Sequence, residues 1–111
     1  MREIKFRAWD KEDKYMLDWV LIKLDVEYSI NQLLEMNRFE MMQFTGLHDK
    51  NGMEIYEGDI VLGRSEPATG TVEFSYGSII VDWHGPDIDD LRDYHEFLEV
   101  IGNIYENPEL L

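Results

Sequence analysis

The chain has 111 residues, 44% of them hydrophobic and 13% aromatic, which suffices for one globular domain with its own core and excludes wholesale disorder. It has no cysteine, which excludes disulfides, thiol catalysis and thiolate metal sites. Its 24 acidic and ten basic residues give a net charge of −14, which disfavours docking to nucleic acids or anionic membranes. Because the sequence has neither a signal-peptide pattern nor an apolar run long enough to span a bilayer, we expect a cytoplasmic protein.

The first 24 residues predict a β-hairpin. Ile4, Phe6 and Ala8 alternate with polar residues, which is typical of a half-buried strand. A polar run over residues 10–14 predicts a turn, and the apolar stretch from Met16 to Leu24 predicts the returning strand.

The next segment, residues 25–37, is ambiguous. Its apolar residues from Val26 to Leu34 recur at helical spacing, and Ser29 with Gln32 fits a capping box. We expect a short amphipathic helix here, while the β-branched residues before it leave a longer strand pair open.

The rest of the chain predicts a succession of short strands. The turn at 49–52 contains Gly52, which is free to adopt a positive φ, and Asp59 can hydrogen-bond the turn before the next strand. Residues 63–70 predict an exposed loop, and 89–97 one or two helical turns. The expected strands are 41–45, 53–56, 60–62, 71–74, 78–83 and 98–105. These strands and turns predict a β-rich α+β fold that forms a closed or partly closed barrel.

Three segments carry a family resemblance: REIKFRAWD at the start, QFTGLHDKNGMEIYEGDIV in the middle and EVIGNIYENPEL at the end. In this order they resemble the YopX family of phage and prophage proteins from Gram-positive bacteria. The resemblance implies a small, self-associating SH3-like barrel of phage accessory origin in a bacterial host cell. It supplies no catalytic or ligand-binding residues. We expect a single domain in which 1–42 form the hairpin and a variable segment, and 43–111 the barrel-like region.

Candidate reactive groups have simpler structural interpretations. The turn at Asp49 lacks the spacing and the bidentate Glu of a calcium loop, and Asp59 fits a turn anchor better than an acid–base partner of Glu57. The acidic loop 82–96, with His84 and His95, could collect a metal ion. Neither histidine has a recognisable ligand spacing. We therefore expect no catalytic residue, cofactor or functional metal site.

The aromatic residues are the stronger candidates for function. Some must fill the core, but the chain has more large rings than one small barrel needs. The rest could form an interaction surface, most simply between copies of the chain. Our candidates for that surface are Trp9, Trp19, Tyr76, Trp83 and Tyr94.

The preferred hypothesis is a non-enzymatic, acidic protein-interaction module that modulates a host or phage protein and forms a homo-oligomer. One version is charge mimicry, in which acidic side chains occupy a nucleic-acid site on the partner. The alternative is a metal-dependent hydrolase or small-ligand enzyme that uses the loop 82–96. A weaker alternative is nucleic-acid binding through the basic N-terminal hairpin.

Overall fold

The computed structural model describes residues 4–24, 30–63 and 68–111. The chain forms two compact units, Met1–Phe44 and Thr45–Leu111, named here the N-terminal unit and the C-terminal unit. Strand β3 (Phe39–His48) runs from the first unit into the second. In the part of the chain that the structure describes, no helix is long and apolar enough to cross a membrane.

The N-terminal unit contains the antiparallel hairpin that the alternation of its first residues predicts. Strand β1 (Phe6–Asp10) pairs on one side with β2 (Tyr15–Leu17) and on the other with β3. Asp10 stabilises the turn between β1 and β2, because its Oδ1 accepts hydrogen bonds from the backbone N–H groups of Glu12 and Asp13.

The predicted returning strand, Met16 to Leu24, is wrong over most of its length. Strand β2 ends at Leu17, and helix α1 follows it over Trp19–Leu24. Asp18 caps this helix: its Oδ1 accepts the backbone N–H of Leu21 at 2.9 Å. Because a continuous apolar run has no clear period, its hydrophobicity alone could not separate a strand from a helix.

The ambiguous segment contains helix α2 (Ile30–Glu35), so the helical interpretation is confirmed for these residues. The backbone N–H of Met36 donates to the carbonyl of Gln32 at 3.1 Å and extends the hydrogen bonding past the end of the helix. The predicted cap residue Ser29 lies outside the described residues, and so does the start of the segment.

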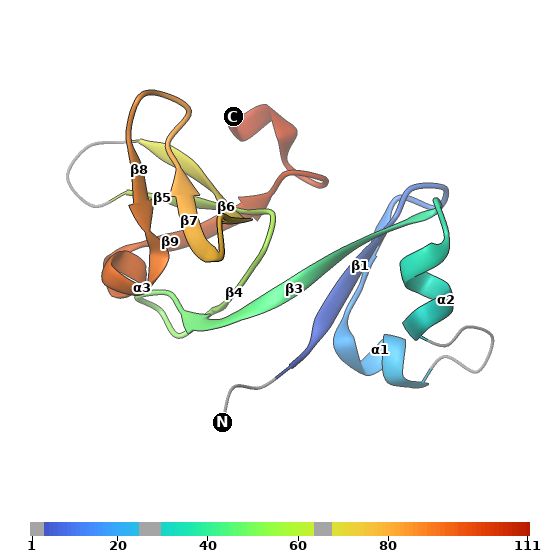
Figure 1. Ribbon diagram of the computed structural model, residues 1–111. Coiled ribbons are helices and arrows are strands. Elements are labelled where there is room, and N and C mark those ends of the chain that lie inside the picture. The colour runs from blue at the N-terminus through green and yellow to red at the C-terminus, as the bar shows by residue number, and fades with distance from the viewer. Residues whose placement is uncertain (1–3, 25–29, 64–67) are drawn as a thin grey trace. The chain divides into compact units, whose positions relative to one another are not determined.

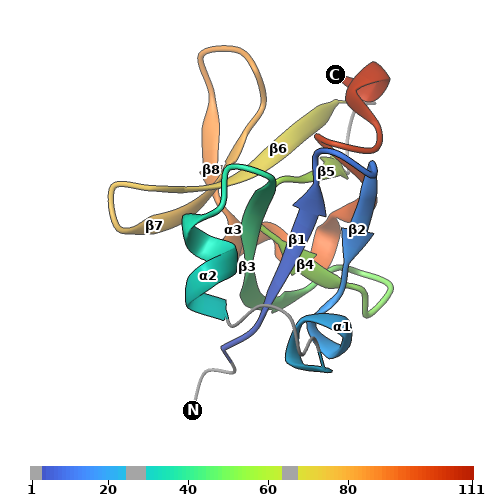
Figure 2. The same ribbon diagram turned by 90° about the vertical axis from the view of Figure 1, so that its right-hand side faces the viewer.

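Both helices lie over one face of strands β1 and β3 (Figures 1 and 2). The buried core there consists of Ala8, Ile22 and Phe39. Four partly buried side chains pack against this core: Leu17, Trp19, Met36 and Met41. The N-terminal unit thus has a small apolar core, built from one face of a hairpin and two short helices.

The C-terminal unit is built on a curled five-stranded antiparallel sheet that forms a half-barrel (Figure 1). Its strand order is β8-β7-β6-β5-β9. The bounds of these strands are β5 Asp59–Leu62, β6 Thr69–Ser75, β7 Ser78–Asp82, β8 Ile88–Asp90 and β9 Glu99–Asn103. A further strand, β4 (Glu54–Tyr56), pairs with β3. The predicted β-rich class and partly closed barrel are confirmed.

One strand of this sheet was not predicted. The helical turns expected near the end of the acidic loop are present as α3 (Leu91–Tyr94) and the 3-10 turn η1 (His95–Phe97). The residues before them form β8, whose sequence Ile-Asp-Asp is unfavourable for a strand. Antiparallel pairing with β7 stabilises β8 in spite of the low strand propensity of its sequence. A last 3-10 turn, η2, spans Pro108–Leu110.

The core of the C-terminal unit follows the alternation of its strands. Val72 in β6 lies directly opposite Val81 in β7, and both are fully buried. The other buried members of this cluster are Ile55, Val61, Ile79, Leu91 and Leu98. This larger core holds the turns, loops and short helix of the C-terminal unit in which Tyr76, Trp83 and Tyr94 lie.

Candidate interaction surface

Asp49, in the middle segment of the family resemblance, anchors a turn, as predicted. Its carboxylate accepts backbone hydrogen bonds from Asn51 at 2.8 Å and Met53 at 2.9 Å, and from Val100 in β9 at 2.8 Å. Burial raises the pKa of Asp49, but these hydrogen bonds outweigh it and leave the pKa below its usual value. The carboxylate is therefore engaged in joining the β3–β4 turn to β9.

Asp59 also anchors a turn, and this prediction is confirmed. Its side chain is 1% exposed, and Oδ2 accepts the backbone N–H of Tyr56 at 2.7 Å. Gly58 adopts a φ of 87°, and its N–H donates to the carbonyl of Val72 at 2.8 Å. The sharp bend between β4 and β5 thus depends on both residues.

The closing segment of the resemblance forms a third hydrogen-bonded turn. Asn103 accepts from the backbone N–H groups of Tyr105 and Glu106 through Oδ1, and its own N–H donates to Oδ1 of Asn107. A Cβ on Gly102 would lie 2.5 Å from that Asn107 oxygen, so a glycine is needed for the close approach. The middle and closing segments of the resemblance therefore supply the side chains that hold these three turns.

The carboxylates of the acidic loop are also engaged in local structure. Asp82 Oδ1 accepts the backbone N–H of His84 at 2.8 Å. Asp90 caps α3 by accepting from the backbone N–H of Arg92, and it also pairs with the Arg92 guanidinium at 2.9 Å. The hydrogen bond to that guanidinium lowers the pKa of Asp90. Hydrogen bonds and an ion pair formed by its own charged side chains therefore stabilise the conformation of this loop.

The histidines of this loop are also engaged in hydrogen bonds, each with a different partner. His84 Nε2 lies 2.8 Å from the hydroxyl of Thr71, and His95 Nδ1 donates to the carbonyl of His48 at 2.7 Å. Among the residues described, no group of three or more His, Asp or Glu side chains is placed to hold a metal ion. The structure brings no described metal-ligand set together in the loop that the enzymatic alternative requires.

Trp83, a predicted surface residue, has a structural role. Its indole packs against the core of the C-terminal unit, and Nε1 donates to Asp89 Oδ2 at 2.8 Å. A Cβ on Gly70 would lie 2.8 Å from the ring, and one on Gly63 would lie 3.2 Å from it. The two glycines make room for this ring, so Trp83 is mainly a packing residue.

The two tryptophans of the N-terminal unit differ in their packing. Trp9 is 8% exposed and does not belong to the small apolar core of this unit. Trp19 is half-buried, packs against the small core and has the ammonium of Lys23 5.7 Å from its ring centroid. Trp19 therefore contributes to the apolar core of this unit.

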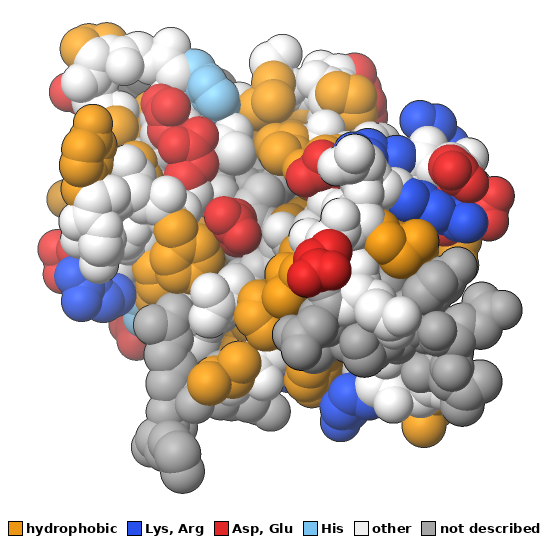
Figure 3. Space-filling model, turned by 45° about the vertical axis from the view of Figure 1, so that its right-hand side comes forward, with side chains coloured by type: hydrophobic (Ala, Val, Ile, Leu, Met, Phe, Trp, Pro, Cys, Tyr) orange, Lys and Arg blue, Asp and Glu red, His pale blue; other side chains and the backbone are white. Residues whose placement is uncertain are grey.

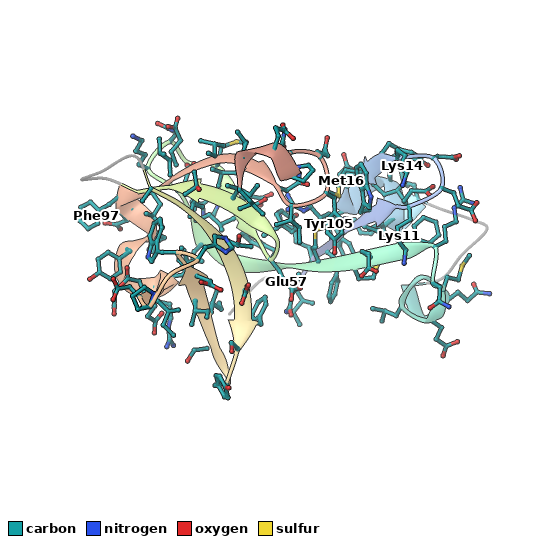
Figure 4. The ribbon with its side chains drawn as sticks, turned by 90° about the horizontal axis from the view of Figure 1, so that it is seen from above. Lys11, Lys14, Met16, Glu57, Phe97 and Tyr105 are labelled. Carbon is teal, nitrogen blue, oxygen red and sulfur yellow. The ribbon has the colours of Figure 1, made fainter. Side chains whose placement is uncertain are left out.

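The two tyrosine candidates are the exposed ones. Tyr94, at the end of α3, is 43% exposed. Tyr76, in the turn between β6 and β7, is completely exposed and adopts a φ of 51°. Phe97, which the sequence did not single out, is also exposed and projects from η1 (Figure 4). With Phe74, which is 36% exposed, the structure thus leaves four aromatic side chains of the C-terminal unit at the surface.

Charge is divided very unequally between the units. Residues 45–111 contain 15 acidic and three basic residues, a formal net charge of −12. Residues 1–44 contain nine acidic and seven basic residues, for a net charge of −2. Nearly all of the excess negative charge therefore belongs to the C-terminal unit.

Two basic side chains of the N-terminal unit, Arg38 and Lys11, are paired with acids. Arg38 binds Asp10 at 2.9 Å and Asp13 at 3.0 Å, and Lys11 binds Glu40 at 3.1 Å. Figure 3 shows basic and acidic side chains next to one another at its upper right. The Arg38 hydrogen bond lowers the pKa of Asp10 to about 2, in spite of burial. These ion pairs offset part of the positive charge of the hairpin.

An exposed apolar strip lies on α1, where the sequence predicted a strand. Val20 is 58% exposed, Leu21 49% and Leu24 70%, whereas Ile22 is buried in the small core. Reading the segment as a helix would have revealed this strip, because only one side of α1 then faces the core.

Comparisons with known proteins agree with this architecture. No curated protein matches the chain significantly. A solved structure, that of protein EF1440 from Enterococcus faecalis, is similar with a TM-score of 0.73 and 28% sequence identity, covering 100% of this chain and 99% of that one. The family model described as YopX protein matches residues 5–111. The chain therefore belongs to the YopX family.

Proposed function

We propose that this protein is a phage or prophage accessory protein that binds a basic host or phage protein in the cytoplasm of the bacterial host and modulates it without catalysis. The acidic C-terminal unit supplies the binding surface. The observation that carries this proposal is the charge of −12 on residues 45–111 beside a nearly balanced N-terminal unit. Such a field accelerates encounters with positively charged surfaces and repels anionic ones.

The carboxylates fall into two groups. Asp49 and Asp59 are buried in turns, where they hold the fold. Asp87, Asp93 and Glu96 are exposed along the loop and helical turns after β7. The exposed group can meet a partner without disturbing the scaffold, so we assign it to recognition.

The N-terminal unit has a different role in the proposal. Its exposed apolar strip, Val20, Leu21 and Leu24, joins copies of the chain into a homo-oligomer. The low net charge of this unit favours that contact, because two C-terminal units would repel each other. Light scattering tests this: we expect an oligomer mass for the native chain and a monomer mass for L24K. An equal mass for both would contradict the assignment.

Capture from host lysate tests the main proposal. The immobilised full-length chain is exposed to nuclease-treated lysate at about 0.15 M and about 0.5 M salt, since screening shortens with ionic strength. We expect a basic protein that is retained at low salt and released at high salt. A partner that is retained equally at both concentrations, or that is not basic, would contradict an electrostatic surface.

A further inference from the structure

The turn between β6 and β7 has an unusual residue for its backbone conformation. Ser75 and Ser78 pair across the hairpin, so Tyr76 and Gly77 are the two central residues of the turn. Both have positive φ, 51° and 76°, as a type I′ turn requires. Asn or Gly normally occupies the first of these positions, because a bulky side chain is strained there.

Among the residues that the structure describes, none packs against the Tyr76 ring to compensate for that strain. The Tyr76 side chain is completely exposed, so its ring buries no surface within the chain. Trp83, in contrast, packs on the core over two glycines. Residues in strained backbone conformations cluster at functional sites.

The position of the turn suits contact with another molecule. The β6–β7 hairpin reaches beyond the rest of its sheet, to the left in Figure 2 and toward the bottom of Figure 4. Phe74, two residues before the tyrosine, is 36% exposed and extends the apolar character of this arm. Tyrosine is one of the residue types that most often dominate binding energy at protein interfaces.

We propose that Tyr76 is the anchor of the interface: its ring enters an apolar pocket on a partner protein, and Lys and Arg residues around that pocket face the acidic surface of the C-terminal unit. This inference rests on the proposed function, because the basic rim is deduced from the charge of −12. Electrostatic attraction raises the association rate, and burial of the Tyr76 ring lowers the dissociation rate.

The test uses the most abundant salt-released protein captured from lysate, purified and titrated against full-length variants. Y76N keeps the turn conformation and removes the ring, whereas Y76F keeps the ring. We expect Y76N to weaken binding by about thirtyfold or more, as for other interface anchors, and Y76F to weaken it only slightly. We also expect the Tm of Y76N to rise by a few degrees, because the strain is relieved.

The possible results separate the two proposals. If the captured protein binds native chain and Y76N equally, the anchor is wrong while the acidic surface stands. If no salt-released basic protein is captured, both are wrong. A fall in the Tm of Y76N would show that the ring belongs to the fold, and a change of oligomer mass in Y76N would make it a self-contact; either result overturns the anchor.

Discussion

The two units use charged side chains in different ways. In the N-terminal unit, Arg38 and Lys11 are paired with acids around one hairpin turn, and the net charge is nearly zero. In the C-terminal unit, a few carboxylates hold turns and the others lie at the surface with few basic partners. The difference teaches that a count of acidic residues does not locate a binding surface until the structural carboxylates have been set apart.

The largest expected effect is on the C-terminal unit, from D49A. Removing this carboxylate leaves three backbone N–H groups without their acceptor. One of these lost hydrogen bonds joins β9 to the β3–β4 turn. We expect a loss of about 3 kcal/mol in the free energy of unfolding, measured by urea denaturation. The control D93A, at an exposed position of the same unit, should change it by less than about 0.5 kcal/mol. Equal effects would show that Asp49 is not a structural carboxylate.

A smaller loss is expected from crowding the Trp83 ring with G70A. The added Cβ would lie 2.6 Å from Val81 Cγ1 and 2.8 Å from the indole, so the core must shift. We expect a cost of about 2 kcal/mol in the same denaturation experiment. G85A is the matched control, because a Cβ there meets no atom within 4 Å. A neutral G70A would mean that Trp83 is not held over this glycine.

Acid should weaken the N-terminal unit through Asp10. The folded pKa of about 2 lies below the ordinary value of 3.8, so the stabilisation is present above about pH 4 and is lost as the pH falls toward 2. Residue-resolved hydrogen exchange at pH 5 and pH 2.5 should show faster opening around β1 and β2 in acid. D10N should lose most of this pH dependence there; a variant that keeps the full dependence would assign it to another group.

The smallest effect concerns a second strained turn. Lys14, at the end of the β1–β2 turn, adopts a φ of 59° and is exposed. K14N should raise the free energy of unfolding by about 0.5 kcal/mol, because Asn tolerates this conformation. K14A keeps the strain and should give no such gain. A stabilisation by Ala as large as that by Asn would show that positive φ is not the cause.

The sequence predicted most strands correctly, because their side chains alternate and turn residues separate them. Val72 and Val81 illustrate this: each lies on an apolar face that the period-two pattern defines. The pattern failed at α1, where an apolar run without a clear period concealed a helix, and at β8, where two aspartates stand in a strand. In both places a capping contact or a neighbouring strand determines the structure.

The candidate site was less accessible to sequence reasoning. The turn at Asp49 could be predicted locally, but its bond to Val100 joins residues that are 51 positions apart. Trp9 and Trp83 could not be separated from Tyr76, because burial depends on the whole fold. The positive φ of Tyr76 follows from a two-residue hairpin register, which the loop sequence Ser-Tyr-Gly-Ser did not fix.

In the proposed function, exposed acids of the C-terminal unit recognise the partner. Two full-length triple variants test this claim against the captured partner: D87N/D93N/E96Q in the C-terminal unit and E12Q/D13N/E35Q in the N-terminal unit. Both remove three exposed negative charges. At about 0.15 M salt the first should weaken binding by about tenfold, while the second leaves it within about twofold. Equal weakening by both variants, or weakening by the second alone, would contradict the claim.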